Sequence, residues 1–335
     1  MIITRTPYRL SFFGGGSDYP EHYLKHGGAV LATSINKYCY ITTRTLPPFF
    51  DHSFRVVYSK IELASSPKDI KHPSVKEVLK YLNVEEGLEI QHQGDLPARS
   101  GIGSSSSFTA GLLHSVLALR GQMISKFDLA MKTIHVEQNL IGEKVGSQDQ
   151  VTASVGGFNV LRFQRDGSIV VNPLIISEAR RLQLNDHLLM FFTGISRDSQ
   201  TITRNKIEKI KLNPASINEM SQLVEDALSI LKSDRDLTDF GILLHETWKL
   251  KRAIADDISN QRVDSIYDAA LKNGAIGGKL LGAGGGGFIV FFAPPDTHSN
   301  IICALEKYVH VPFRFERQGS TVCLYEPGGF GNESI

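Results

Sequence analysis

Three glycine-rich clusters, each beside an expected strand or helix, constrain the fold and function of this chain more than any other feature. They lie at residues 14–16, 101–103 and 282–287. Glycine can take a positive φ angle and lets the backbone approach a ligand closely. A single cluster of this kind indicates a tight turn, whereas three in one chain favour a binding site for a polyanion.

The middle cluster carries the most specific signal. It reads PARSGIGSSSS over residues 97–107 and leads into an expected helix at 105–120. Small residues at the start of a buried helix leave N–H groups free at the positive end of the helix dipole, which favours phosphate. Serine hydroxyls at the same place can ligate Mg²⁺. A helix N-cap would need one serine, and this loop has four.

Motifs of other nucleotide-binding and metal-binding classes fail in detail. The stretch 274–280 lacks the spacing of a Walker A loop. Residues 282–287 spell GxGxxG but precede a strand, and the DFG triplet at 239–241 has no HRD-type loop to accompany it. The 3 cysteines show no CxxC spacing and the 11 histidines no HExxH pair, so neither pattern predicts a zinc site.

Composition limits the partners. Lys plus Arg number 36 and Asp plus Glu 35, so no bulk charge attracts nucleic acid or an anionic membrane. The longest apolar runs, at 188–192 and 288–293, are far shorter than the ~20 residues that span a bilayer. The first residues do not have the pattern of a signal peptide. We therefore expect a cytoplasmic protein that binds small molecules and neither nucleic acid nor membrane, in an oligomeric state that the sequence leaves open.

The 335 residues correspond to about two domains, which we expect at 1–185 and 186–335. Ser125 and Asp128 form a capping-box pattern at the start of an expected helix over 126–141, and Ser216 and Glu219 form another. The chain is expected to be helical from about 200 to 272, with helices around 243–248 and 263–272. Strands are expected at 2–13, 29–43, 55–59, 88–92, 158–163, 188–193, 288–292, 313–316 and 321–325.

The three clusters together resemble the motifs of the GHMP small-molecule kinases, the family of galactokinase, homoserine kinase and mevalonate kinase. Residues 97–105 are similar to the family's PxxxGLGSS motif, and the other clusters match its N-terminal and C-terminal motifs in the same order. The first motif, PxRxSFxGGGSD from Pro7 to Asp18, is closest to the bacterial D-glycero-D-manno-heptose 7-phosphate kinase branch, with Ser17 in place of threonine. This resemblance implies an α+β fold of two domains, one like domain 2 of ribosomal protein S5 and one ferredoxin-like, with the active site between them.

The resemblance also implies the catalytic and metal-binding residues. Asp149 matches the family's catalytic aspartate, and Glu137 matches the glutamate that holds Mg²⁺ together with Ser105. The spacing from Glu137 to Asp149 is one residue longer than mevalonate kinase implies, so Glu143 stays an alternative. Taken alone, Asp149 would be interpreted as a turn residue and Glu137 as part of a solvated helix face, and the nearby serine-rich loop favours the functional interpretation of both.

The remaining site residues follow from the same resemblance. Arg9 is expected either to offset negative charge in the site or to face solvent on its strand, and Lys279 to brace the third loop. The loop expected to hold ATP comprises Pro97, Gly101, Ile102, Gly103, Ser104, Ser105 and Ser106. The residues expected to bind the acceptor are Gly15, Gly16, Ser17, Asp18, Arg197, Gly284 and Gly285.

The function that the resemblance implies uses ATP and Mg²⁺. It is phosphorylation of the anomeric hydroxyl of D-glycero-D-manno-heptose 7-phosphate to the 1,7-bisphosphate, for nucleotide-activated heptose and for lipopolysaccharide or capsule synthesis. Three alternatives stay open: another sugar 1-kinase of the fucose or galactose type, a mevalonate-type kinase, and a non-catalytic sensor of sugar and ATP.

Overall fold

The first sheet is built on two long strands, β1 (Ile2–Phe13) and β2 (Gly28–Thr45). The computed structural model describes residues 1–195 and 214–328, and within these ranges this sheet has nine strands. β1 and β2 are antiparallel over almost their whole length, from the pair Ile2 and Thr43 to the pair Phe13 and Leu31. The C-terminal half of β2 pairs with β5 (Leu88–Gly94) and its N-terminal half pairs with β6 (Phe158–Phe163). β2 therefore connects both of these strands to β1 in one sheet.

The edges of the first sheet include strands from both ends of the chain. Three short strands, β3 (Phe54–Val57), β4 (Ile61–Ala64) and β7 (Ile169–Pro173), come from the first half. The last two, β12 (Phe315–Glu316) and β13 (Thr321–Tyr325), pair with β2 and β1. The expected domain boundary at 185 is wrong for these two strands, which join the first sheet. A strand pattern in the sequence predicts that a segment forms a strand and does not predict which sheet the strand joins.

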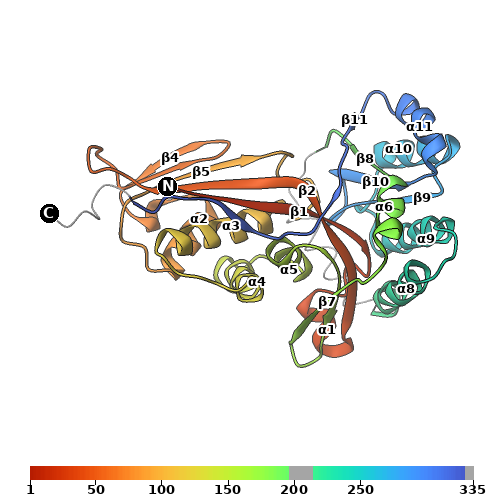
Figure 1. Cartoon of the computed structure of the whole chain (residues 1–335), viewed down its shortest axis with the longest axis horizontal. Coiled ribbons are helices and arrows are strands. Elements are labelled where there is room, and N and C mark those ends of the chain that lie inside the picture. Colours follow the sequence, from red (N-terminus) through yellow and green to blue (C-terminus); the bar gives the residue numbers. More distant parts are fainter. Residues whose placement is uncertain (196–213, 329–335) are drawn as a thin grey trace.

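Helices cover one face of this sheet: α2 (Pro73–Tyr81), α3 (Ser104–Leu119), α4 (Lys126–Ile134) and α5 (Gln148–Val155) (Figure 1). The Ser125 cap of α4 is confirmed, since its Oγ accepts a hydrogen bond from the Asp128 N–H at 3.0 Å. The expected helix over 126–141 is not one α-helix, however. It ends at Ile134 and continues as a π-helix, η2 (His135–Ile141).

The second sheet is antiparallel, in the order β11-β8-β10-β9. Its strands and helices lie at one end of the first sheet (Figure 1). Ser216, expected as a helix cap, lies within α8, whose described residues run from Pro214 to Lys232. The strands are β8 (Leu188–Phe192), β9 (Gly277–Leu280), β10 (Phe288–Phe292) and β11 (Val309–His310), and the helices are α6 (Glu178–Asp186), α8 (Pro214–Lys232), α9 (Thr238–Ile254), α10 (Gln261–Lys272) and α11 (His298–Ala304). No helix of the described residues has the length and apolar character needed to cross a membrane.

The two parts of the chain pack together at the end of β1. Phe240 of α9 makes edge contacts with Phe12 and Phe13, with ring centroids 5.4 and 5.1 Å apart. Lys279 of β9 is buried, and its Nζ donates to the Phe12 carbonyl at 2.6 Å. Tyr19, just after the first glycine cluster, lies within the core of the second part. The first glycine cluster therefore sits at the junction of the two parts, and Lys279 braces that junction.

Folding stability is expected to fall below pH 6.5, in part because of His22 on α1 (Pro20–His26). Its side chain is buried, and burial together with the neighbouring His26 lowers the pKa of His22 to about 4. An unfolded histidine has a pKa of about 6.5, so between these values the unfolded chain binds a proton that the folded chain excludes. The stabilisation is complete above pH 6.5 and is lost as the pH falls toward 4.

Urea unfolding at pH 7.5, 6.0 and 5.0 measures this effect. His22→Gln should reduce the pH dependence of the unfolding free energy by up to about 1.4 kcal/mol per pH unit, the contribution of one proton. If the unfolding free energy depended on pH equally in the wild type and in His22→Gln, His22 would take up a proton as readily in the folded chain as in the unfolded one.

Candidate active site

The phosphate loop, residues 97–103, ends in an open helix N-terminus. Gly101 and Gly103 have φ angles of +82° and +72°, which favour glycine. Gly103 is the N-cap of α3, and no side chain of the described residues caps this helix. The Oγ of Ser104 instead accepts from the Arg99 N–H at 3.1 Å and shapes the loop. The first N–H groups of a helix have no partner within it, so this end of α3 has the geometry of an anion site.

The third glycine cluster packs directly against the phosphate loop, as the hairpin between β9 and β10. A Cβ on Gly282 would lie 2.3 Å from the Gly101 Cα, so the two backbones touch. The Phe288 N–H donates to the Ser100 carbonyl at 3.0 Å. On the other side, the buried Nζ of Lys251 donates to the carbonyls of Leu280 and Gly282 at 2.7 and 2.8 Å. Glycine is needed here because the two loops meet through their main chains.

Gly282→Ala should therefore destabilise the protein and weaken nucleotide binding. The added methyl would collide with Gly101, and the φ of +71° at Gly282 is itself strained for alanine. We expect a loss of about 2–4 kcal/mol in the free energy of unfolding and a raised KM for ATP. Gly121→Ala is the matched control, because its φ of +68° is similar but no atom lies within 4 Å of the added Cβ. If Gly282→Ala lowered the free energy of unfolding no more than Gly121→Ala does, the result would contradict the contact between the two loops.

Arg9 and Asp149 form a two-point ion pair beside the phosphate loop. Nε of Arg9 donates to Oδ1 of Asp149 at 2.8 Å, and Nη2 donates to Oδ2 at 3.0 Å. The remaining Nη1 donates to the Gly101 carbonyl at 2.6 Å. The Arg9 side chain is only 5% exposed, which excludes the solvent-facing alternative, and Asp149 is 26% exposed. Arg9 thus fixes the Asp149 carboxylate at the loop, and Asp149 lies in the first turn of α5 rather than in a simple turn.

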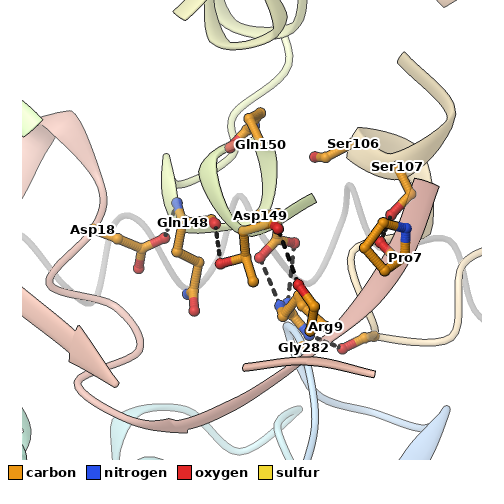
Figure 2. A network of polar contacts seen from close by, with 12 residues as sticks. Pro7, Arg9, Asp18, Ser106, Ser107, Gln148, Asp149, Gln150 and Gly282 are labelled. Atoms are coloured by element: carbon orange, nitrogen blue, oxygen red, sulfur yellow. Dashed lines mark hydrogen bonds and ion pairs between the residues drawn. The ribbon is translucent and has the colours of Figure 1, made fainter. Parts of the chain in front are cut away.

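Asp18 lies on the other side of Asp149, with Gln148 between them (Figure 2). Its Oδ1 accepts from the Gly16 N–H at 2.9 Å, and its Oδ2 accepts from the Gln148 N–H at 3.3 Å. A Cβ on Gly146 would lie 1.9 Å from Oδ2, so only glycine fits at that position. The buried Asp18 carboxylate is thereby held in place by backbone N–H groups of its own loop and of the start of α5.

Ser17 has a different place from the one predicted. Its hydroxyl donates to the carbonyls of Gly14 and Ala29, at 2.8 and 3.0 Å, and accepts from the Ala29 N–H. Ser17 therefore ties the first glycine cluster to β2, and its hydroxyl is committed to the backbone. This contact explains why a hydroxyl residue suits the position.

Glu137 is fully buried, which excludes a solvated helix face. Its Oε2 accepts hydrogen bonds from Ser106 Oγ at 2.8 Å and from Gln150 Nε2 at 2.6 Å. Within the described chain its Oε1 has no partner. Burial raises the pKa of Glu137 to about 8, and the negative charge of Glu143 contributes to the rise. The pKa of Glu143 is also raised, chiefly by burial.

The serine paired with Glu137 is Ser106, whereas the sequence paired it with Ser105. The Ser105 side chain lies on the exposed side of α3, and the Ser106 side chain is buried against Glu137. The negative charge of Glu143 acts on the Glu137 carboxylate, so the two glutamates lie near each other and both remain candidates for one metal site. Glu137 lies in the π-helix η2, and a π-turn accommodates one extra residue within an otherwise α-helical segment.

This donor set fits Mg²⁺. It consists of two carboxylates and a hydroxyl, with one carboxylate oxygen unpaired in a buried place. No group of three or more His, Cys, Asp or Glu side chains suited to a metal occurs in residues 1–195 and 214–328. Mg²⁺ typically binds through one or two carboxylates and takes its other ligands from phosphate and water, so a larger protein cage is not required.

Two predicted acceptor-binding residues, Gly284 and Gly285, make their contacts with the second part of the chain. Gly285 donates its N–H to the Ile258 carbonyl at 2.8 Å and accepts from Asn260 Nδ2 at 3.0 Å, and Gly284 packs on Ile258. Arg197 lies outside the described residues. The sequence reasoning overlooked Gln148 and Gln150, although both flank Asp149 directly and could have been recognised by that position.

These features coincide in one family. The chain matches the GHMP kinases N terminal domain over residues 71–157 and the GHMP kinases C terminal domain over residues 223–311. It belongs to the GHMP kinase family, whose members are ATP-dependent kinases of small molecules, and the α+β fold expected from the sequence is confirmed.

Among individual proteins, the chain is 31% identical over 333 residues to the D-glycero-alpha-D-manno-heptose 7-phosphate kinase of Campylobacter jejuni, covering 95% of this chain and 97% of that protein. It is similar in structure to a D-glycero-D-manno-heptose 1-phosphate kinase of Bacteroides thetaiotaomicron, with a TM-score of 0.78, 22% identity, and 97% and 100% of the two chains covered. A putative sugar kinase of Campylobacter jejuni has a TM-score of 0.71 and 25% identity, with 96% and 97% covered.

Proposed function

We propose that this GHMP kinase transfers the γ-phosphoryl group of ATP to the anomeric hydroxyl of D-glycero-D-manno-heptose 7-phosphate. The observation that carries the proposal is the position of Asp149, which Arg9 fixes between the phosphate loop and the buried Asp18 carboxylate. Phosphoryl transfer needs an acceptor hydroxyl aligned with the γ-phosphate and a group to accept its proton. Asp149 lies where both substrates would meet.

Each part of the site has a role in this reaction. The N–H groups at the start of α3 bind the nucleotide phosphates. Asp18 accepts hydrogen bonds from acceptor hydroxyls and so orients the sugar. Asp149 orients the reacting hydroxyl and takes its proton as the oxygen bonds to the γ-phosphorus and the bond to ADP breaks. Arg9 is a positioning residue, because each of its three guanidinium nitrogens donates to Asp149 or to the Gly101 carbonyl.

Mg²⁺ would be held by Glu137, Ser106 and Glu143, where it would neutralise charge on the nucleotide phosphates. Gln150 supports this arrangement by donating to Glu137, and it connects the metal-binding residues to α5, which carries Asp149. The same helix therefore positions the proton acceptor and the residues that would hold the metal.

The base of ATP has a candidate place beside α2. A hollow of about 450 Å³ lies there, next to the last residues of the π-helix that carries Glu137. His72 at the start of α2 stacks on Phe108 of α3, with ring centroids 4.6 Å apart, which connects this region to the phosphate helix. The hollow is lined by Lys68, Asp69, Ile70, Lys71, Pro73, Lys76, Glu77, Leu140 and Ile141.

The choice of heptose 7-phosphate over other acceptors rests on the N-terminal motif and on the curated relative of Campylobacter jejuni. Fucose and galactose would use the same Asp18 and the same Asp149. A mevalonate-type acceptor has no set of sugar hydroxyls for Asp18 to bind. A non-catalytic sensor would have no use for the ion pair that fixes Asp149.

ATP turnover with a panel of acceptors tests the proposal. We expect ADP release with heptose 7-phosphate to exceed that with fucose, galactose, heptose 1-phosphate and mevalonate, and ³¹P NMR of the product to show a new phosphate on C1. A new phosphate at another carbon, or a preference for another acceptor, would replace the assignment. Absence of turnover with every acceptor would favour the sensor.

A further inference from the structure

Two buried side-chain oxygens near Asp149 and Asp18 have no hydrogen-bond partner among the described residues. Gln148 is 8% exposed and Ser11 is 6% exposed. Within residues 1–195 and 214–328, neither Gln148 Oε1 nor Ser11 Oγ has a hydrogen-bond partner. A buried polar atom without a hydrogen-bond partner lowers the stability of the fold. Such atoms are therefore uncommon in folded proteins unless a ligand or a water molecule supplies the missing hydrogen bond.

Both side chains reach the same small space beside Gly15. A Cβ on Gly15 would lie 3.8 Å from Ser11 Oγ and 3.9 Å from Gln148 Nε2. The N–H of Gln148 donates to Asp18, and the next residue is Asp149. Figure 2 shows the Gln148 side chain between the two carboxylates. The space therefore adjoins both the carboxylate assigned to bind the acceptor and the one assigned to take its proton.

We propose that Gln148 and Ser11 bind the acceptor hydroxyl next to the one that is phosphorylated, which in the heptose is the 2-hydroxyl. This inference rests on the proposed function. The amide nitrogen of Gln148, which is the atom of this side chain that faces the space, donates to the sugar oxygen, and the sugar hydroxyl donates to Ser11 Oγ. An acceptor without that hydroxyl leaves both groups unpaired. Gln148 and Ser11 therefore favour acceptors that carry a hydroxyl on the carbon next to the reacting one.

Steady-state kinetics with heptose 7-phosphate test the two residues. Gln148→Met keeps the side-chain volume and removes the amide, and we expect its KM for the sugar to rise about 10- to 100-fold while its KM for ATP changes less than about 2-fold. Ser11→Ala should raise the KM for the sugar several-fold. Ser154→Ala is the matched control, because Ser154 is also buried with an unpartnered Oγ but packs near Gly319 on the far part of α5.

Gly15→Ala offers a test that does not depend on removing a polar group. Its Cβ would meet Ser11 and Gln148 at ordinary contact distances, and Gly15 does not have a positive φ angle. The variant should therefore fold with an unchanged melting temperature. Its methyl would occupy the space assigned to the sugar hydroxyl, so the KM for heptose 7-phosphate should rise as in Gln148→Met.

The 2-deoxy analogue of heptose 7-phosphate completes the design. The wild type should lose about 10- to 100-fold in kcat/KM on this analogue, and Gln148→Met should show little further loss. An unchanged KM in both Gln148→Met and Gly15→Ala, or equal efficiency of the wild type on the two sugars, would overturn the subsite and show that water fills the space. Should the wild type use another sugar instead, the proposed substrate fails, and the same variants on that sugar decide the subsite.

Discussion

Asp149→Asn is expected to lower kcat by about 10²- to 10⁴-fold, the range for loss of a general base. Asparagine keeps the size of the side chain, so the loop and α5 should keep their places. It cannot accept the proton of the acceptor hydroxyl, and it leaves the buried Arg9 without its anionic partner. Nucleotide affinity, measured by calorimetry with a non-hydrolysable ATP analogue and Mg²⁺, should change only slightly, because the site proposed for the phosphates is the start of α3, which the substitution leaves unchanged.

Asp166→Asn controls for the loss of a carboxylate, since Asp166 lies in an exposed turn between β6 and β7. Its kcat should equal that of the wild type. If Asp149→Asn kept kcat within a few-fold, Asp149 would be a structural partner of Arg9 only, and catalysis would rest on the electrostatic field of the site.

Glu137→Gln is expected to raise the Mg²⁺ concentration needed for half-maximal rate by about 10- to 100-fold, as befits the loss of a group that holds the metal. The KM for the acceptor should change much less, because Asp18 and the first glycine cluster are untouched. Ser106→Ala should shift the Mg²⁺ requirement in the same direction. The double variant should be less impaired than the two separate effects predict, because both act on one ion.

Ser105→Ala decides between the sequence-based pairing and the pairing seen in the structure. The exposed Ser105 variant should keep the Mg²⁺ requirement of the wild type. A larger shift in Ser105→Ala than in Ser106→Ala would mean that the metal binds away from the Ser106–Glu137 contact. Glu143→Gln should give a smaller shift than Glu137→Gln, since Glu143 is partly exposed.

Much of the active site was predictable because its chemistry is local in sequence. Gly101 and Gly103 precede a helix within a few residues, so an anion site follows from helix geometry alone. The contact between Gly101 and Gly282 was not predictable in this way, because it joins backbones that are far apart along the chain. The glycine pattern predicts that another group lies close to the backbone. It does not predict whether that group is a ligand or another loop of the chain.

The pairing of Glu137 depends on a feature that hydrophobic periodicity cannot resolve. The sequence predicted Glu137 but paired it with the wrong serine. Ser105 and Ser106 are neighbours in the first turn of α3, and the sequence pattern there does not show which of them faces the buried carboxylate. Gln148 was overlooked for a related reason. The short helix α5 has no strong apolar stripe, and the side chains around Asp149 were therefore judged without knowing that they begin a helix.

The return of the last strands to the first sheet bears on how the chain folds during synthesis. β13 pairs with β1, and the Met1 amino group contacts the Glu326 carbonyl. The ribosome releases β1 first and β13 only after all of the second sheet has emerged. The edge of β1 must therefore stay exposed through most of translation, and contacts of such sequence separation form slowly. We expect a nascent chain arrested before residue 315 to be prone to edge-to-edge association through β1.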